Sequence, residues 1–152
     1  MSDDWTLPDP HYQPGFYADV AMKRLFAFIV DTVLLILATL LFALLSFGIG
    51  FFLLIPLWLA MNLAYRTIAL ARWSATPGMM LFAIEFRDAR GHRFDQAAAF
   101  QHSLGFVFSW MFPPVQLVSA ILMATGERGQ GLTDLVLGSV AINRPANRSA
   151  NR

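Results

Sequence analysis

The sequence contains no cysteine and few charged residues. Without a thiol, a disulfide framework, a thiol nucleophile and a thiolate metal site are all excluded. Asp, Glu, Lys and Arg make up 14% of the chain, against about 25% in an average soluble protein, while 57% is hydrophobic. The formal net charge of +1 leaves no broad basic field, so nucleic acid is not an expected partner. This composition indicates that the partner of the chain is the lipid bilayer.

The N-terminus also lacks the positively charged segment and short apolar stretch of a cleavable signal peptide. Its first ten residues are acidic and contain proline. We therefore expect residues 1–16 to form a polar tail, and the first apolar segment to be retained as structure.

No charged side chain occurs between Thr32 and Tyr65. A straight helix of that length would reach roughly 50 Å, whereas the hydrocarbon core of a bilayer is about 30 Å thick. The chain must therefore turn, and the two glycines within residues 46–50 mark the best place. The sequence predicts two transmembrane helices, at about residues 20–46 and 50–72.

A third uncharged stretch runs from Ser103 to Gly126, with Pro113 and Pro114 at its middle. Proline lacks the backbone N–H and clashes with the preceding turn, so it kinks or breaks a helix. Two paths remain open for this element. It forms either one kinked span, or two half-helices, at 103–112 and 115–125, in a re-entrant hairpin that returns to its side of entry.

The distribution of basic residues favours the hairpin. Lys23 and Arg24 flank the first predicted helix, and several arginines follow the second, whereas the turn between the helices is uncharged. The positive-inside rule therefore places the N-terminus and residues 73–102 in the cytoplasm. A hairpin keeps the arginine-containing C-terminal tail on the same side, whereas a single span puts it outside.

Two short segments have the pattern of β-strands. Apolar residues alternate from Met80 to Arg87 after a turn signal, and Gly138–Asn143 is a second candidate. Isolated strands need partners for their backbone groups, so the two are expected to pair on one side of the membrane. The predicted fold class is an all-α membrane protein with two transmembrane helices, a Pro-broken third element and a small cytoplasmic β-pair. Residues 144–152 are expected to be a disordered tail.

Asp31 lies inside the first apolar stretch, where an ionised carboxylate is costly unless it is paired or hydrated. Arg66 lies as many residues after the turn at 48–49 as Asp31 lies before it. An antiparallel hairpin therefore places the two side chains at the same depth in the membrane. We predict an intramembrane pair of Asp31 and Arg66. Asn62, one turn away on the same face, is expected to extend this polar patch.

Part of the first predicted helix resembles a family signature. Arg24 to Asp31 matches the pattern R-x-x-A-x-x-x-D of the RDD family, small bacterial membrane proteins named for one arginine and two aspartates. Other segments similar to the family pattern follow in order: Thr76-Pro77-Gly78, Gly129-Gln130-Gly131-Leu132-Thr133-Asp134 and Gly138-Ser139-Val140. The resemblance covers about residues 17–143, which we take as the membrane domain. By matching position, Arg24, Asp31 and Asp134 are the three residues that name the family.

Two positions depart from that pattern. The lysine that usually follows T-P-G is Met79, and the histidine that usually precedes the last aspartate is Thr133. No proton-handling role can therefore be carried over to position 133. The resemblance implies a multi-pass protein of the bacterial inner membrane and, for some members, a role in solute or cation transport.

Each polar residue also has a structural interpretation. Arg24 and Arg66 suit anchors in the lipid headgroups, and Asp31 suits an ion pair that fixes helix register. Asp134 follows glycines and suits the cap of a short helix at 135–138.

Two functions therefore stay open. One is a small transporter or cation/proton antiporter subunit, in which Asp31 binds the ion or proton; since three short elements cannot enclose a pathway, it requires a homo-oligomer. The other is a non-transporting membrane scaffold or interaction protein. The scattered histidines do not have the spacing of metal ligands, so no metal site is predicted. No catalytic arrangement is evident, so neither a cofactor nor an enzymatic activity is predicted.

Overall fold

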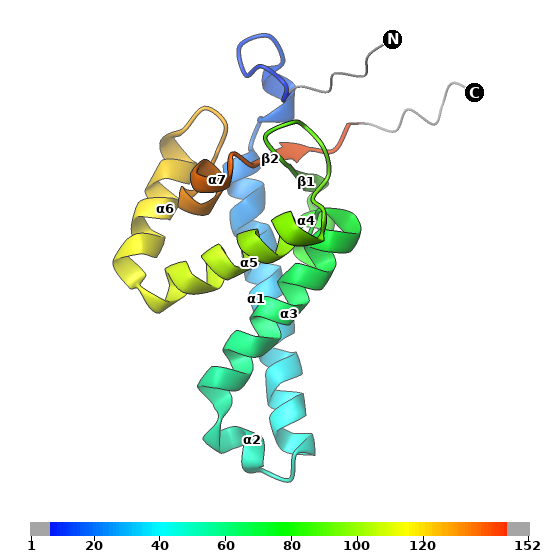
Figure 1. Cartoon of the computed structure of the whole chain (residues 1–152), viewed down its shortest axis with the longest axis vertical. Helices are drawn as coiled ribbons and strands as arrows, with labels where there is room; N and C mark the ends of the chain where they lie inside the picture. Colours follow the sequence, from blue (N-terminus) through cyan, green and yellow to red (C-terminus); the bar gives the residue numbers. More distant parts are fainter. Residues whose placement is uncertain (1–6, 146–152) are drawn as a thin grey trace, which may run out of the picture.

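The computed structural model describes residues 7–145, which are mainly helical (Figure 1). The helices are η1 (Pro14–Phe16, a 3-10 turn), α1 (Val20–Leu45), α2 (Ile49–Phe52), α3 (Leu54–Trp73), α4 (Pro77–Leu81), α5 (Gln96–Met111), α6 (Pro113–Thr125) and α7 (Leu132–Leu137). Strands β1 (Ile84–Arg87) and β2 (Val140–Asn143) form a small sheet. Residues 1–6 and 146–152, which hold most of the predicted C-terminal tail, lie outside the described residues.

Helices α1 and α3 form the long hairpin predicted from the uncharged run (Figure 1). The turn between them contains α2 and begins at Gly48, whose φ of 88° is a left-handed conformation that glycine adopts without strain. Ser46 holds the turn: its Oγ accepts a 2.7 Å hydrogen bond from the N–H of Gly50 and donates a 2.6 Å bond to the carbonyl of Ala43. Glycine is needed at position 50, since a Cβ there would lie 2.6 Å from Cα of Ala43.

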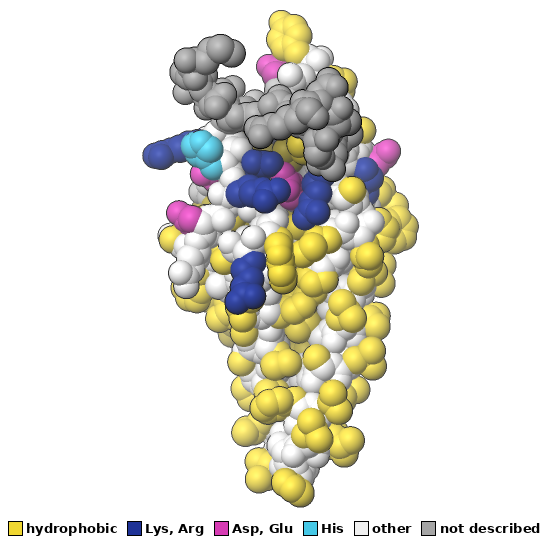
Figure 2. All heavy atoms as spheres, turned by 90° about the vertical axis from the view of Figure 1, so that its right-hand side faces the viewer, with side chains coloured by type: hydrophobic (Ala, Val, Ile, Leu, Met, Phe, Trp, Pro, Cys, Tyr) yellow, Lys and Arg dark blue, Asp and Glu magenta, His cyan; other side chains and the backbone are white. Residues whose placement is uncertain are grey.

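The hairpin has the surface of a membrane protein. Pro14–Leu45 and Leu54–Trp73 are each long and apolar enough to cross a bilayer. Many large apolar side chains on both are exposed, which suits contact with lipid rather than water. Figure 2 shows hydrophobic side chains covering the far end of the molecule, while Lys and Arg gather toward the end that carries the sheet.

The predicted strand from Met80 to Arg87 is only half correct. Residues Pro77–Leu81 form α4, and the strand begins at Ile84. The helix start outweighs the apolar alternation because Thr76 caps it, accepting a 3.3 Å hydrogen bond from the N–H of Met79, and Pro77 occupies the first helical position.

The predicted pairing of the two strands is confirmed. β1 and β2 are antiparallel, with Ile84 opposite Asn143 and Arg87 opposite Val140. This pairing brings the segment before α5 and the segment after α7 to the same end of the molecule (Figure 1).

The third apolar stretch is broken at its prolines, as predicted. α5 ends at Met111, α6 begins at Pro113, and the two axes are bent by 120°. Phe112, between them, has an extended ψ of 89°, because the residue before a proline is disfavoured in the helical region. The bend and the paired strands bring both ends of this element toward the end of the molecule that carries the sheet, and the hairpin path through the membrane stays a prediction.

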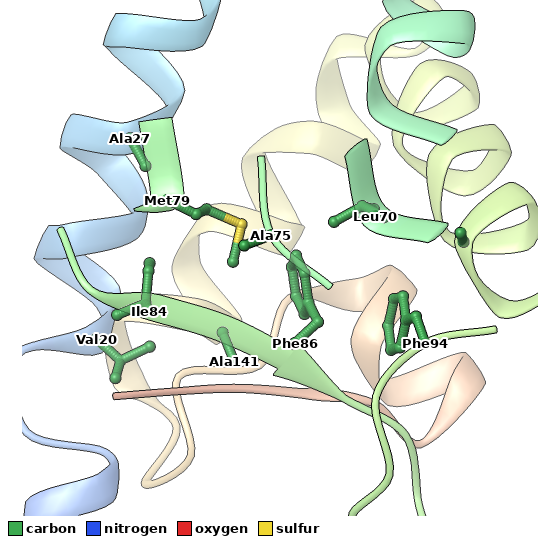
Figure 3. Packing of buried hydrophobic residues seen from close by; sticks show 10 residues of the cluster. Val20, Ala27, Leu70, Ala75, Met79, Ile84, Phe86, Phe94 and Ala141 are labelled. Carbon is green, nitrogen blue, oxygen red and sulfur yellow. The ribbon is translucent and has the colours of Figure 1, made fainter. Parts of the chain in front are cut away.

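The main hydrophobic core lies between the sheet and the adjacent ends of the long helices. Figure 3 shows Phe86 of β1 beside Phe94, with Leu70 of α3 on the same side, while Met79 of α4 and Ile84 lie toward the other end of the cluster. The rings of Phe86 and Phe94 stack with centroids 5.3 Å apart. This core fixes the sheet against the base of the hairpin, where the polar residues of the family signature converge.

Candidate functional site

Arg24 of α1 and Asp134 of α7, two of the signature residues, form a buried ion pair. Nη1 of Arg24 lies 2.6 Å from Oδ2 of Asp134, and the same nitrogen donates a 2.8 Å hydrogen bond to the carbonyl of Gly129. The aspartate is 1% exposed. The contact joins segments 110 residues apart in sequence, so Arg24 does more than anchor in the headgroups.

Asp134 also accepts three other hydrogen bonds. Oδ2 accepts from the N–H of Gly131 at 2.9 Å, and Oδ1 accepts from Oγ of Ser139 at 3.1 Å and from His102. Burial raises the pKa of this carboxyl, but Arg24, His102 and the Gly131 N–H outweigh burial and hold that pKa well below its usual range. The predicted capping role is partly realised, since the Gly131 bond closes the first turn of α7, which begins at Leu132 rather than at 135.

His102 of α5 is the residue that sequence reasoning missed. Its Nε2 lies 2.7 Å from Oδ1 of Asp134, and the imidazole is 2% exposed. It packs against the rings of Phe86 and Phe94, with centroids 4.4 and 5.5 Å away. Position 133 holds threonine, and the imidazole beside Asp134 comes from α5 instead, where no local spacing could reveal it.

The other nitrogen of His102, Nδ1, is buried and has no hydrogen-bond partner among residues 7–145. The ionised Asp134 accepts, so Nε2 carries the proton of the neutral ring and Nδ1 is free to take a second one. The buried imidazole of His102 thus has one nitrogen that is hydrogen-bonded to Asp134 and one nitrogen without a hydrogen-bond partner within residues 7–145.

Asp31 is clamped by the T-P-G segment. Its Oδ2 accepts a 2.5 Å hydrogen bond from Oγ1 of Thr76, and its Oδ1 accepts bonds of 2.8 Å from the N–H of Gly78 and 2.7 Å from the hydroxyl of Tyr65. Position 78 must be glycine, since a Cβ there would lie 2.3 Å from the carbonyl oxygen of Ala27. These contacts give a physical reason for two of the matched segments: one supplies the carboxylate and the other supplies its donors.

The predicted pair of Asp31 and Arg66 is not formed. Within the described residues, no carboxylate oxygen lies within 4.0 Å of Arg66, and Tyr65, its neighbour on α3, reaches Asp31 instead. Successive side chains on a helix point about 100° apart. The prediction placed Asp31 and Arg66 at the same depth, but it did not establish that they lie on facing sides of their helices. Arg66 is 8% exposed and its guanidinium carbon lies 3.7 Å from the centre of the Phe106 ring. Asn62 is buried nearby, and its Oδ1 has no partner within residues 7–145.

A cavity of about 380 Å³ connects these groups. Its wall is formed mainly by α1, α5, α6 and α7. The polar and charged side chains along it include Arg24, Asp31, Arg66, His102 and Asp134. The apolar side chains include Leu25, Phe28, Phe106, Trp110 and Met123. A concave, mostly apolar space with a few convergent polar groups is the usual form of a small-molecule site.

Comparison with known proteins agrees with the signature. A model of the RDD family matches residues 18–138, which is most of the chain. No curated protein and no solved structure matches the chain. The matched range contains Arg24, Asp31, Asp134 and the clamp of Asp31. The chain therefore belongs to the RDD family.

Proposed function

We propose that this chain is a subunit of a small solute or cation transporter, and that His102 and Asp134 bind the proton that is coupled to transport. The observation that carries this proposal is the buried His102–Asp134 pair on the wall of the cavity. Ionisable groups within membrane domains are expensive to bury and mark transport pathways and proton relays more often than other positions.

The His102–Asp134 pair can take up one proton and release it again. Neutral His102 donates from Nε2 to the ionised Asp134, and uptake of one proton at Nδ1 produces an imidazolium held by the same carboxylate. Loss of that proton restores the starting state. Histidine suits this task because it is the side chain that most readily gains and loses a proton near physiological pH, and burial of His102 favours the neutral imidazole as the resting state.

Asp31 is less suited than His102 and Asp134 to bind this proton. Oδ1 of Asp31 accepts two hydrogen bonds and Oδ2 accepts one, so little capacity remains for an ion. Asp31 is better suited to hold the T-P-G segment against α1.

The distribution of charge supports a cytoplasmic location for the N-terminus and the sheet, and the choice of a bacterial inner membrane follows from the family resemblance. Glu85 of β1 is buried between Arg87, Arg93 and Arg144, with nitrogen–oxygen distances of 3.3 Å to Arg93 and 3.6 Å to Arg144. Arginine-rich segments next to membrane helices favour the cytoplasmic side. Since two long helices and one hairpin cannot surround a pathway, the proposal requires a homo-oligomer.

A membrane scaffold is the alternative function, and the clamp of Asp31 favours it. A carboxylate held by three internal donors can serve a purely structural role, and the core at the sheet offers a fixed platform for a partner. Under this alternative the cavity is only a space between helices.

Flux measurements in proteoliposomes decide between the two. Vesicles are loaded with sodium or potassium under a pH gradient, and proton movement is followed with a pH-sensitive dye. We expect flux in the wild type and its loss in His102→Gln, because glutamine can keep a hydrogen bond to Asp134 but cannot take up a proton. His92→Gln, at an exposed position, is the matched control. Absence of wild-type flux across all gradients would overturn transport and leave the scaffold.

A further inference from the structure

Arg66 is a buried cation that lacks a hydrogen-bonded counterion. Its side chain lines the cavity, its Nε has no partner within residues 7–145, and no ion pair within 4.0 Å includes it there. The two nearby aspartates are already occupied. Asp31 is held by Tyr65, Thr76 and Gly78, and Asp134 is held by Arg24 and His102.

The ring of Phe106 stabilises this guanidinium only in part. The guanidinium carbon lies 3.7 Å from the ring centre, which is a close cation–π contact. A π face satisfies none of the five N–H donors of the guanidinium, so Arg66 keeps its capacity for a planar anion. Carboxylates and phosphates are the groups that arginine binds through paired N–H bonds.

The rest of the cavity is suited to an apolar body. Phe28 and Trp110 stack with centroids 5.5 Å apart along its wall, and Leu25 and Met123 also line it. At the bend of α5 and α6, Ser109 donates a 2.7 Å hydrogen bond to Gln116, so these two polar side chains have partners of their own. Arg66 and Nδ1 of His102 thus both lack hydrogen-bond partners within residues 7–145, and Arg66 is the one of the two that carries a permanent positive charge into this mainly apolar space.

We infer that the cavity binds an amphipathic anion, whose carboxylate or phosphate pairs with Arg66 and whose apolar body lies along Phe28 and Trp110. The inference rests on the proposed function where it names the transported class: of the two alternatives, solute or cation, it selects an anionic solute. A cation is disfavoured because it would face Arg24 and Arg66 while both aspartates already have their donors. The volume of about 380 Å³ fits a single short chain with its charged group, or the headgroup end of a phospholipid whose chains remain in the bilayer.

Binding is tested on the full chain in nanodiscs of zwitterionic lipid, without any gradient. The probe is bromodecanoate, whose bromine quenches Trp110 on contact, and Trp110→Phe identifies that signal. We expect saturable quenching that decanoate reverses and that decyltrimethylammonium, of equal chain length and opposite charge, does not. Inorganic phosphate should compete poorly because it has no apolar body. Equal competition by the cationic amphiphile, or by phosphate, would overturn the inference.

Arg66→Gln should weaken bromodecanoate binding at least about tenfold, as expected for loss of a charge-assisted contact. Arg72→Gln removes the same charge from an exposed position on the same helix and should leave binding unchanged. Equal affinities of the two variants would contradict the assignment of Arg66. If Arg66→Gln does not fold, a second variant uses Ala120 of α6, which lines the cavity. Ala120→Phe narrows the cavity with Arg66 in place, and unchanged binding by that variant contradicts the inference as well.

The source of the anion is distinguished by the lipid. If phosphatidylglycerol in the nanodiscs competes with bromodecanoate, a membrane lipid is the source of the anion, and if it does not, a soluble organic acid is. Flux without anion binding overturns this inference and leaves the transporter standing. Binding without flux overturns the transporter alone.

Discussion

The N–H of Gly78 donates a 2.8 Å hydrogen bond to Oδ1 of Asp31, and a Cβ at position 78 would lie 2.8 Å from the same oxygen. Glycine is therefore required at position 78 for two reasons. Its backbone must come close enough to Asp31 to donate the hydrogen bond, and there is no room for a side chain. This contact ties the first transmembrane helix to the segment that follows the second. Two signature segments distant in sequence thereby form one structural unit.

Gly78→Ala should destabilise the protein by about 1–3 kcal/mol, as for overpacking in a close-packed interior. The added methyl would meet the carbonyl oxygen of Ala27 at 2.3 Å and the carboxylate of Asp31. Thermal unfolding in detergent measures the loss. Gly15→Ala is the control, since a Cβ there has no neighbour within 4 Å among the described residues. Equal unfolding temperatures for the two variants would show that the clamp is not tight.

Asp31→Asn should lower stability by about 1–3 kcal/mol, because an amide cannot accept from all three donors and leaves buried groups unsatisfied. Unfolding by heat or denaturant is the measurement. Asp19→Asn, at the start of the same helix, removes a carboxylate that makes no capping hydrogen bond and should be nearly neutral. A fully stable Asp31→Asn variant that has lost flux would instead return Asp31 to the role of the proton site.

Acid should destabilise the protein through Asp134. Its pKa in the folded state lies below the ordinary value of 3.8, so its contribution to stability is complete above that pH and is lost as the pH falls further. Arg24 is the largest of the causes that lower this pKa. The unfolding temperature of the wild type should therefore fall more steeply below pH 4 than that of Arg24→Gln.

Lys23→Gln serves as the control for that pH series. Its amine donates a 2.6 Å hydrogen bond to Asn143 rather than to Asp134, so the acid sensitivity should persist in this variant. Identical pH profiles for the wild type and Arg24→Gln would refute the role of the ion pair.

The two ends of the α5–α6 element should lie on one side of the membrane. The pairing of β1 with β2 requires it, since backbone hydrogen bonds cannot form across a bilayer. A reporter fused after Arg152 should be active in the cytoplasm, and one inserted at Gly48 should be active outside. A reporter after Arg152 that is active outside would reject the hairpin.

The sequence by itself determined the membrane hairpin, the break at Pro113 and the family. These features follow from the length of an uncharged run, from the missing N–H of proline and from short motifs, all of which are local along the chain. The pairing of the strands was also predictable, because isolated strands need partners.

Only the tertiary structure decided which polar groups meet. The sequence placed Asp31 level with Arg66, but contact depends on the face of each helix, and Tyr65 rather than Arg66 points at the carboxylate. His102 joins Asp134 from 32 residues away, a distance at which no periodicity operates. The side chains in and around a membrane cavity come from helices whose relative rotation is set by packing, so the partners of Asp31, Arg66 and Asp134 emerge only when the helices are assembled.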